Sequence, residues 1–204
     1  LPPELISQIC QDSGLQKKHL VALRLTSKSQ GIHFSASEEF AERYFTDISL
    51  IYTRYSLQTF VEICKHSAFG AAVRKIQLSY SRFIPEFFEA ESKSLHDFSY
   101  CGTMRRQRHE ALDELRRLVH RCDEEEYLND SSDAGNLLAE AFTALSRWQH
   151  SLKISVSHSE SHALGLKRTY SHWWMEDEGE RWKCDVLGTV ALLYRAAVSS
   201  DCVV

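Results

Sequence analysis

The chain has 204 residues, of which 43% are hydrophobic and 25% are charged, and its formal net charge at pH 7 is -4. These values are ordinary for a globular protein and exclude a disordered or collagen-like chain. The acidic balance disfavours nucleic acid and anionic membrane surfaces as partners, because the chain carries no global positive field. No run of about 18 apolar residues and no signal-peptide pattern occurs, so we expect neither a membrane span nor a leader.

The six cysteines are widely spaced in a chain that is large enough to fold without disulfides. They are Cys10, Cys64, Cys101, Cys122, Cys184 and Cys202. We expect them to be reduced thiols, which places the protein in the cytoplasm, the nucleus or both.

The first 45 residues have the spacing of short helices. Two prolines suit a helix N-terminus, and apolar residues then recur at helical spacing until Gly14 provides a stop. A second helix is expected over residues 17–25 and a third over 34–45. Ser35 and the glutamate three residues later match a capping box at the start of the third helix. The sequence predicts a three-helix module over residues 1–45.

Strand and helix patterns alternate beyond that module. Segments of the form Ile-x-Leu or Ile-x-Val predict strands over residues 47–50, 73–79 and 152–157. Amphipathic helices are expected over 56–66 and 136–148. Together these segments indicate a degenerate β/α repeat in which each unit buries one face against its neighbour.

Insertions are expected to interrupt the repeat at about 83–133 and 158–183. The first contains a charged helix over 104–126, whose mixed charges favour a solvated helix face over a polyanion site. The second is polar and aromatic, which is typical of a long loop. A final helix over 185–198 is apolar along nearly its whole length, so we expect it to be buried on most sides.

Signatures of catalysis are missing from the sequence. No phosphate-binding glycine loop, Gly-x-Ser-x-Gly turn or Cys-x-x-Cys pair occurs, so we predict no catalytic site, no metal and no cofactor. His158 and His162 lie four residues apart, but their serine-rich surroundings favour surface histidines over a metal site. Cys101 has His96 and His109 near it in sequence, yet that proximity does not establish a catalytic pair.

Three tryptophans of the second insertion are weak candidates for substrate contacts: Trp173, Trp174 and Trp182. Tryptophans clustered in a polar segment can anchor a protein interface. Packing against the final helix is the favoured alternative, because an indole is buried there as readily as on a partner.

The opening of the chain resembles the F-box motif. Residues 1–10 read Leu-Pro-Pro-Glu-Leu-Ile-Ser-Gln-Ile-Cys, and residues 20–28 read Leu-Val-Ala-Leu-Arg-Leu-Thr-Ser-Lys. The motif has the form Leu-Pro-x-Glu-Leu, a spaced Ile, and then Leu-x-x-Leu-Arg-Leu-x-Ser-Lys. Residues 45–50 and 69–76 look like the downstream region of F-box proteins of filamentous fungi, which carry degenerate leucine-rich repeats.

The resemblance implies a non-catalytic substrate-receptor subunit of a cullin-RING ubiquitin ligase. Its first helices would dock a Skp-family adaptor, and through it a cullin, while the remainder captures a protein substrate. The implied fold is α/β and rich in helix, with an F-box-like module over 1–45 and an irregular, interrupted leucine-rich-repeat-like region over 46–204. The motif positions that are candidates for the adaptor contact are Leu1, Pro2, Leu5, Ile9, Leu20 and Leu23.

Two alternatives stay open. Residues 29–32 read Ser-Gln-Gly-Ile where the commoner F-box pattern has a bulky aromatic residue. This departure favours an F-box-like protein-interaction module that acts outside a ubiquitin ligase. An enzyme that uses the insertion rich in histidine and tryptophan is the least favoured interpretation.

Overall fold

A computed structural model describes residues 3–11, 14–26, 30–79, 81–83, 104–148, 151–157, 164 and 182–200. The helices within these residues are α1 (Pro3–Gln11), α2 (Lys17–Thr26), α3 (Gln30–Tyr44), α4 (Arg54–Lys65), α5 (Ser67–Ala72), α7 (Met104–Asp130), α8 (Asp133–Ser146) and α10 (Val186–Ser199). The strands are β1 (Asp47–Leu50), β2 (Lys75–Ser79), β3 (Ser81–Phe83), β4 (Lys153–Ser157) and β5 (Trp182–Cys184).

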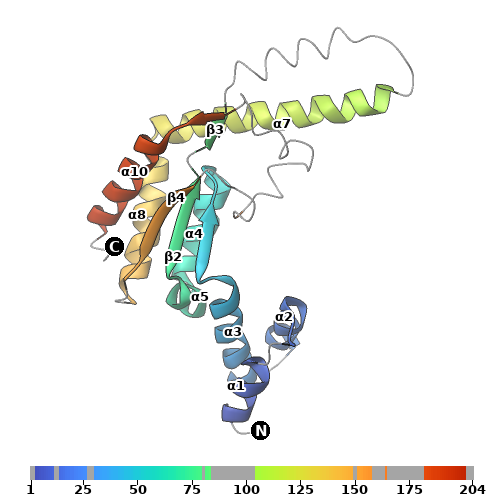
Figure 1. The fold of residues 1–204 in the computed structure, drawn as a ribbon, viewed down its shortest axis with the longest axis vertical. Coiled ribbons are helices and arrows are strands. Elements are labelled where there is room, and N and C mark those ends of the chain that lie inside the picture. The colour runs from blue at the N-terminus through green and yellow to red at the C-terminus, as the bar shows by residue number, and fades with distance from the viewer. Residues whose placement is uncertain are drawn as a thin grey trace.

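Helices α1, α2 and α3 form the N-terminal module, which lies at one end of the molecule (Figure 1). The three helices expected from the sequence are present. The predicted capping box is wrong, however, because α3 begins at Gln30 and Ser35 is buried inside the helix. The buried core of the module consists of Cys10, Leu20, Ala36 and Phe40.

The three predicted strands form one parallel sheet in the order β1-β2-β4. Their apolar residues align in two rows across the sheet, the first made by Ile48, Ile76 and Ile154 and the second by Leu50, Leu78 and Val156. Side chains alternate along a strand, so both rows lie on the same face. The rows belong to, or pack against, the main hydrophobic core.

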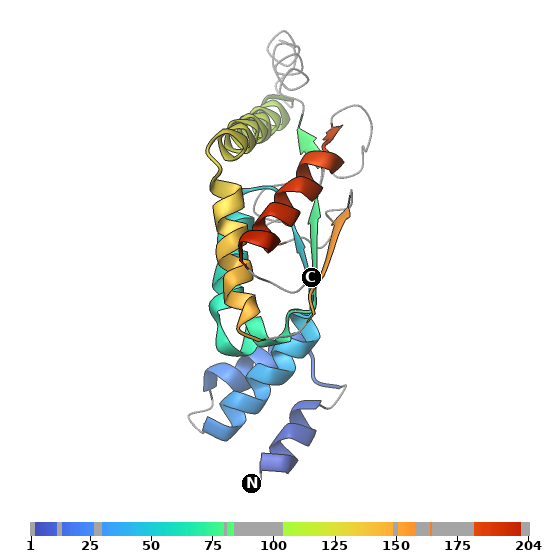
Figure 2. The same ribbon diagram turned by 90° about the vertical axis from the view of Figure 1, so that its left-hand side faces the viewer.

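Helices α4, α8 and α10 follow one another in the same order as the strands. Helix α4 packs on α8 and α8 packs on α10, while α10 also contacts β4. Figure 2 shows α4 and α8 on one side of the sheet and α10 crossing the end of this assembly. We call the three strand–helix units, β1 with α4, β2 with α8 and β4 with α10, the strand–helix stack. The expected α/β, helix-rich fold is therefore confirmed.

The interior of the stack is apolar and tightly enclosed. Phe60 of α4 and Phe142 of α8 are both completely buried, in the same cluster as the sheet residues Ile76 and Leu78. Burial of this kind supplies most of the favourable free energy of folding. A second, two-stranded antiparallel sheet pairs β3 with β5.

The charged helix predicted in the first insertion is α7, which continues to Asp130. Arg116 and Asp113 on its surface form an exposed ion pair with an N–O distance of 3.0 Å. The expected solvated face is wrong for Arg121 and Glu125. Both are buried, and Arg121 Nε donates to Glu125 Oε1 at 3.0 Å.

The expectation that the last helix is buried on most sides is also wrong. One face of α10 is buried at Leu193, Ala196 and Ala197, but Leu187 is 84% exposed and Tyr194 71% exposed. Its outer face is exposed because α10 is the last helix of the stack and has a neighbouring stack helix, α8, on one side only.

Candidate adaptor-binding surface and adjoining groove

The N-terminal module leaves large apolar side chains in solvent. Leu5 and Ile9 of α1 are 45% and 51% exposed, and Leu25 of α2 is 80% exposed. Leu5 and Ile9 lie one helical turn apart and therefore share one face of α1. We call this face the α1 outer face. The four-residue core of the module uses neither of them.

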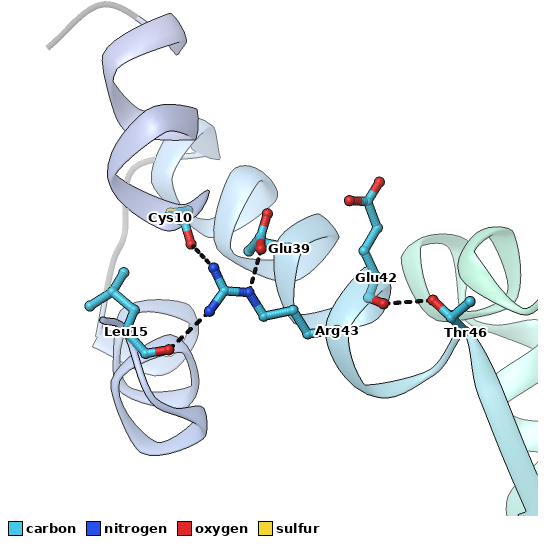
Figure 3. Close-up of polar contacts among 6 residues, drawn as sticks. All are labelled: Cys10, Leu15, Glu39, Glu42, Arg43 and Thr46. Atoms are coloured by element: carbon cyan, nitrogen blue, oxygen red, sulfur yellow. Dashed lines mark hydrogen bonds and ion pairs between the residues drawn. The ribbon is translucent and has the colours of Figure 1, made fainter. Parts of the chain in front are cut away.

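Arg43 of α3 fixes the orientation of α1 (Figure 3). Its Nη2 donates to the carbonyl oxygen of Cys10 at 3.1 Å, and its Nη1 donates to that of Leu15 at 3.0 Å. Its Nε also pairs with the carboxylate of Glu39 one turn earlier in α3. Carbonyl groups in the last turn of a helix have no hydrogen-bond donor within the helix. Arg43 is such a donor for the carbonyl group of Cys10 in α1. The guanidinium thereby holds the end of α1 against α3, with the α1 outer face turned away from the module's core.

Arg24, the arginine of the F-box-like motif, has an internal structural role. Its guanidinium carbon lies 4.7 Å from the ring centre of Phe40 and 4.8 Å from that of Phe69, which are cation–π distances. Its Nε donates to Ser37 Oγ at 3.3 Å. Burial lowers the pKa of Arg24. The residue therefore links α2 to α3 and to α5.

An aromatic joint connects the module to the stack. The rings of Phe45 and Phe69 stack with centres 4.5 Å apart, and His66 stacks on Phe69 at 3.9 Å. His66 Nδ1 also accepts hydrogen bonds from the backbone amides of Ala68 and Phe69 in the first turn of α5. A Cβ at Gly70 would overlap the carbonyl oxygen of Cys64, so the close approach of α5 to the end of α4 requires glycine there. Helix α5 thus packs Phe69, which is partly buried, against the core of the module.

A groove of about 570 Å³ lies beside this joint, between α3 and α5, and we call it the junction groove. Phe34 and Trp148 lie along it and are 60% and 38% exposed. Glu38 and Glu42 of α3 also line it, and the pKa of Glu38 is raised by burial and then by the charge of Glu42. Aromatic side chains are enriched in protein interfaces, so the exposed rings of Phe34 and Trp148 suit contact with a protein segment.

The candidate adaptor residues divide into three groups. Leu5 and Ile9 are exposed and available for contact. Leu20 is completely buried and Leu23 is half-buried against the module core, so in this conformation they can only support the surface. The remaining candidates, Leu1 and Pro2, lie outside the described residues.

Most of the other residues singled out in the sequence also lie outside the described residues. These are Trp173, Trp174, His158, His162, His96 and Cys101, together with the side chain of His109 in α7. Trp182 lies in β5 opposite Phe83, and the structure describes its backbone but not its side chain. The sequence predicts a helix that continues to residue 148, whereas α8 ends at Ser146, so the predicted helix gave no indication of the junction groove that Trp148 lines.

The buried thiols of Cys10 and Cys122 are poor nucleophiles. Burial raises the pKa of Cys10, and burial and Glu125 raise that of Cys122 to about 12. Thiolate is the reactive form of cysteine, so neither thiol is activated. Among the described residues no group of three or more His, Cys, Asp or Glu could hold a metal ion. No helix in that part of the chain is long and apolar enough to cross a membrane.

Comparison with known proteins gives no match. No protein-family model matches the sequence, no curated protein matches it, and no solved structure matches the fold.

Proposed function

We propose that this protein is a non-catalytic substrate-receptor subunit of a cullin-RING ubiquitin ligase. Helices α1 to α3 dock a Skp-family adaptor, and the rest of the chain captures a protein substrate. The observation that carries the proposal is the α1 outer face, since Leu5 and Ile9 occupy positions of an F-box-like motif and are exposed. Arg43 orients that face without using it.

The energetics of the module support a docking role. Full burial of a leucine or isoleucine side chain stabilises by about 1.5–3 kcal/mol. Leu5, Ile9 and Leu25 are each at least 45% exposed, so the protein alone does not obtain much of this stabilisation. An apolar partner surface would supply it, in the manner of a helix that binds a hydrophobic groove.

The junction groove is the described surface that suits substrate capture best. It is concave, and it is lined by residues of both the N-terminal module and α5. Phe34 and Trp148 provide aromatic side chains of the type that anchors interfaces. A substrate segment bound there would lie next to the adaptor-bound module, which is what delivery to a ligase requires.

Co-elution of the full chain with a purified Skp-family adaptor tests the proposal. The full chain is needed because Phe69 of α5 packs against the module's core. We expect a complex, and we expect Ile9→Glu to weaken it by about 10- to 100-fold, the equivalent of losing one buried side chain. Val119→Glu is the matched control, because Val119 of α7 is an exposed aliphatic residue outside the N-terminal module. Equal binding by wild type and Ile9→Glu would overturn the assignment of this face.

The alternative is an interaction module that works outside a ligase. The aromatic joint favours it, since Phe45 and Phe69 of the same chain pack against the module's core. Under this alternative a correctly folded chain binds no adaptor. Circular dichroism that shows native helix in the same sample separates this result from failed folding.

A further inference from the structure

The two edges of the parallel sheet differ. Beside β1, the amide of Leu164 donates to the carbonyl oxygen of Ser49 at 2.7 Å, so that edge is partly covered. On the opposite edge, no described segment pairs with the outer side of β4. An edge strand presents a row of N–H and C=O groups that can pair with another strand.

Helix α10 lies at the same end as β4 and is apolar on both faces. Its outward stripe consists of Leu187, Val190, Tyr194 and Val198, which are between 46% and 84% exposed and recur at helical spacing. Arg195 is the only charged residue in the helix. A groove of about 460 Å³ runs between the two elements, lined by Ile154, Val156, Leu193, Tyr194 and neighbouring small residues. We call β4 and this stripe the open end; Figure 2 looks onto it.

We propose that the open end is a homodimer interface, in which the β4 strands of two copies pair in antiparallel orientation across a twofold axis. The two three-stranded sheets then become one six-stranded sheet. The outward stripe of α10 packs against the second copy beside the strand pair.

The sequence of β4 is complementary to itself in this arrangement. The strand reads Lys-Ile-Ser-Val-Ser, with Ser155 at its centre. When Ser155 lies opposite Ser155 of the second copy, Ile154 faces Val156 and Lys153 faces Ser157. Apolar pairs across strands are stabilising, whereas like charges directly opposite are destabilising, and no such pair arises here.

A second copy suits this surface better than a different protein. The stripe on α10 offers a single charge, Arg195, so it has almost no charged features with which to select a foreign partner. A twofold axis closes the assembly after two copies, whereas parallel, head-to-tail pairing of β4 edges would leave another edge open.

Light scattering after size-exclusion chromatography tests the association. We expect wild type to have twice the 23.5 kDa mass of one chain. Tyr194→Glu should be monomeric, because it places a carboxylate in the centre of the stripe; folding should survive, since the side chain is 71% exposed. Ile9→Glu is the control and should stay dimeric. A monomeric wild type at micromolar concentration, or a dimeric Tyr194→Glu, would overturn the proposal.

Disulfide trapping tests the strand register separately from the mass. Residues directly opposite in antiparallel strands have Cα atoms about 4.5–5.5 Å apart, which suits a disulfide. Ser155→Cys should therefore form a covalent dimer under mild oxidation, and Lys153→Cys should not. A mixture of Lys153→Cys chains and Ser157→Cys chains should form a covalent dimer, because these two positions lie opposite each other in the proposed pairing. Trapping of Lys153→Cys with itself as efficiently as Ser155→Cys would show that the proposed pairing is wrong. Adaptor binding does not enter either measurement, so the dimer and the ligase proposal can fail independently.

Discussion

The N-terminal module and the strand–helix stack are held together by different kinds of contact. The module buries four core side chains and relies on directional contacts made by Arg43 and Arg24. The stack buries two rows of sheet residues under α4 and α8, together with Phe60 and Phe142. The difference shows how a small module can keep apolar side chains on its surface. The hydrogen bonds of Arg43 and the cation–π contacts of Arg24 hold its helices in place, so Leu5 and Ile9 remain available to a partner.

The largest effect is expected from a cavity in the stack. Phe142→Ala should lower the free energy of unfolding by about 3–5 kcal/mol, the usual result for a buried phenylalanine. Phe34→Ala is the matched control in the module, where the side chain is 60% exposed, and should change stability by less than about 0.5 kcal/mol. Urea denaturation measures both, and similar losses would contradict the contrast between the two regions.

The next effect compares two ion pairs on α7 with the same 3.0 Å N–O distance. Glu125→Ala leaves the buried Arg121 guanidinium without this carboxylate, and we expect it to destabilise by about 3 kcal/mol. Asp113→Ala removes the exposed partner of Arg116 and should have an effect of less than about 1 kcal/mol. Thermal unfolding of the two variants provides the comparison. A loss at Asp113 as large as that at Glu125 would show that burial does not set the strength of these pairs.

A smaller and more local effect is expected in the module. Arg43→Met keeps the apolar stem but removes the donors to Cys10 and Leu15, and should destabilise by about 1–3 kcal/mol. Hydrogen exchange should accelerate in α1 more than in α8. Arg195→Met on α10 is the control, because Arg195 is exposed and its Nε donates to the carbonyl oxygen of Ala191 in the same helix. Uniform acceleration throughout the chain would mean that Arg43 stabilises the whole fold and does not act locally on α1.

The smallest effect is a pH dependence at the aromatic joint. Burial, followed by the charges of Arg24 and His33, lowers the pKa of His66 below its ordinary value of 6.5. The unfolded chain then binds the proton more readily, so stability should decline as the pH falls through 6.5 and below. His66→Asn retains an N-cap oxygen for α5 but does not titrate. The stability difference between wild type and His66→Asn should shrink at low pH; a difference constant between pH 5 and pH 8 would refute this role. The opposite contribution of Glu38, whose pKa is raised, cancels in that difference.

Local patterns located most elements of the fold. The Ile-x-Leu and Ile-x-Val segments became the strands of the parallel sheet, because alternation along a strand is visible within a few residues. The predicted capping box at Ser35 was wrong because the surroundings of that serine are set by packing with other helices. The outward stripe of α10 was not predicted because composition does not show which neighbour covers a helix. The contacts of Arg43 could not be predicted from local patterns either. Arg43 reaches Leu15 across 28 residues and Cys10 across 33.

The alignment of the strand rows has a consequence for the lengths of the connections. Ile48 and Ile76 are separated by about 28 residues and Ile76 and Ile154 by about 78, yet both pairs occupy the same row. Because the entropy of closing a loop grows with the logarithm of its length, the longer connection costs only about 0.9 kcal/mol more than the shorter. Burial of a single isoleucine offsets that difference. Relatives of this chain could therefore lengthen or shorten the segments between strands freely, provided that each strand keeps its apolar pair in register.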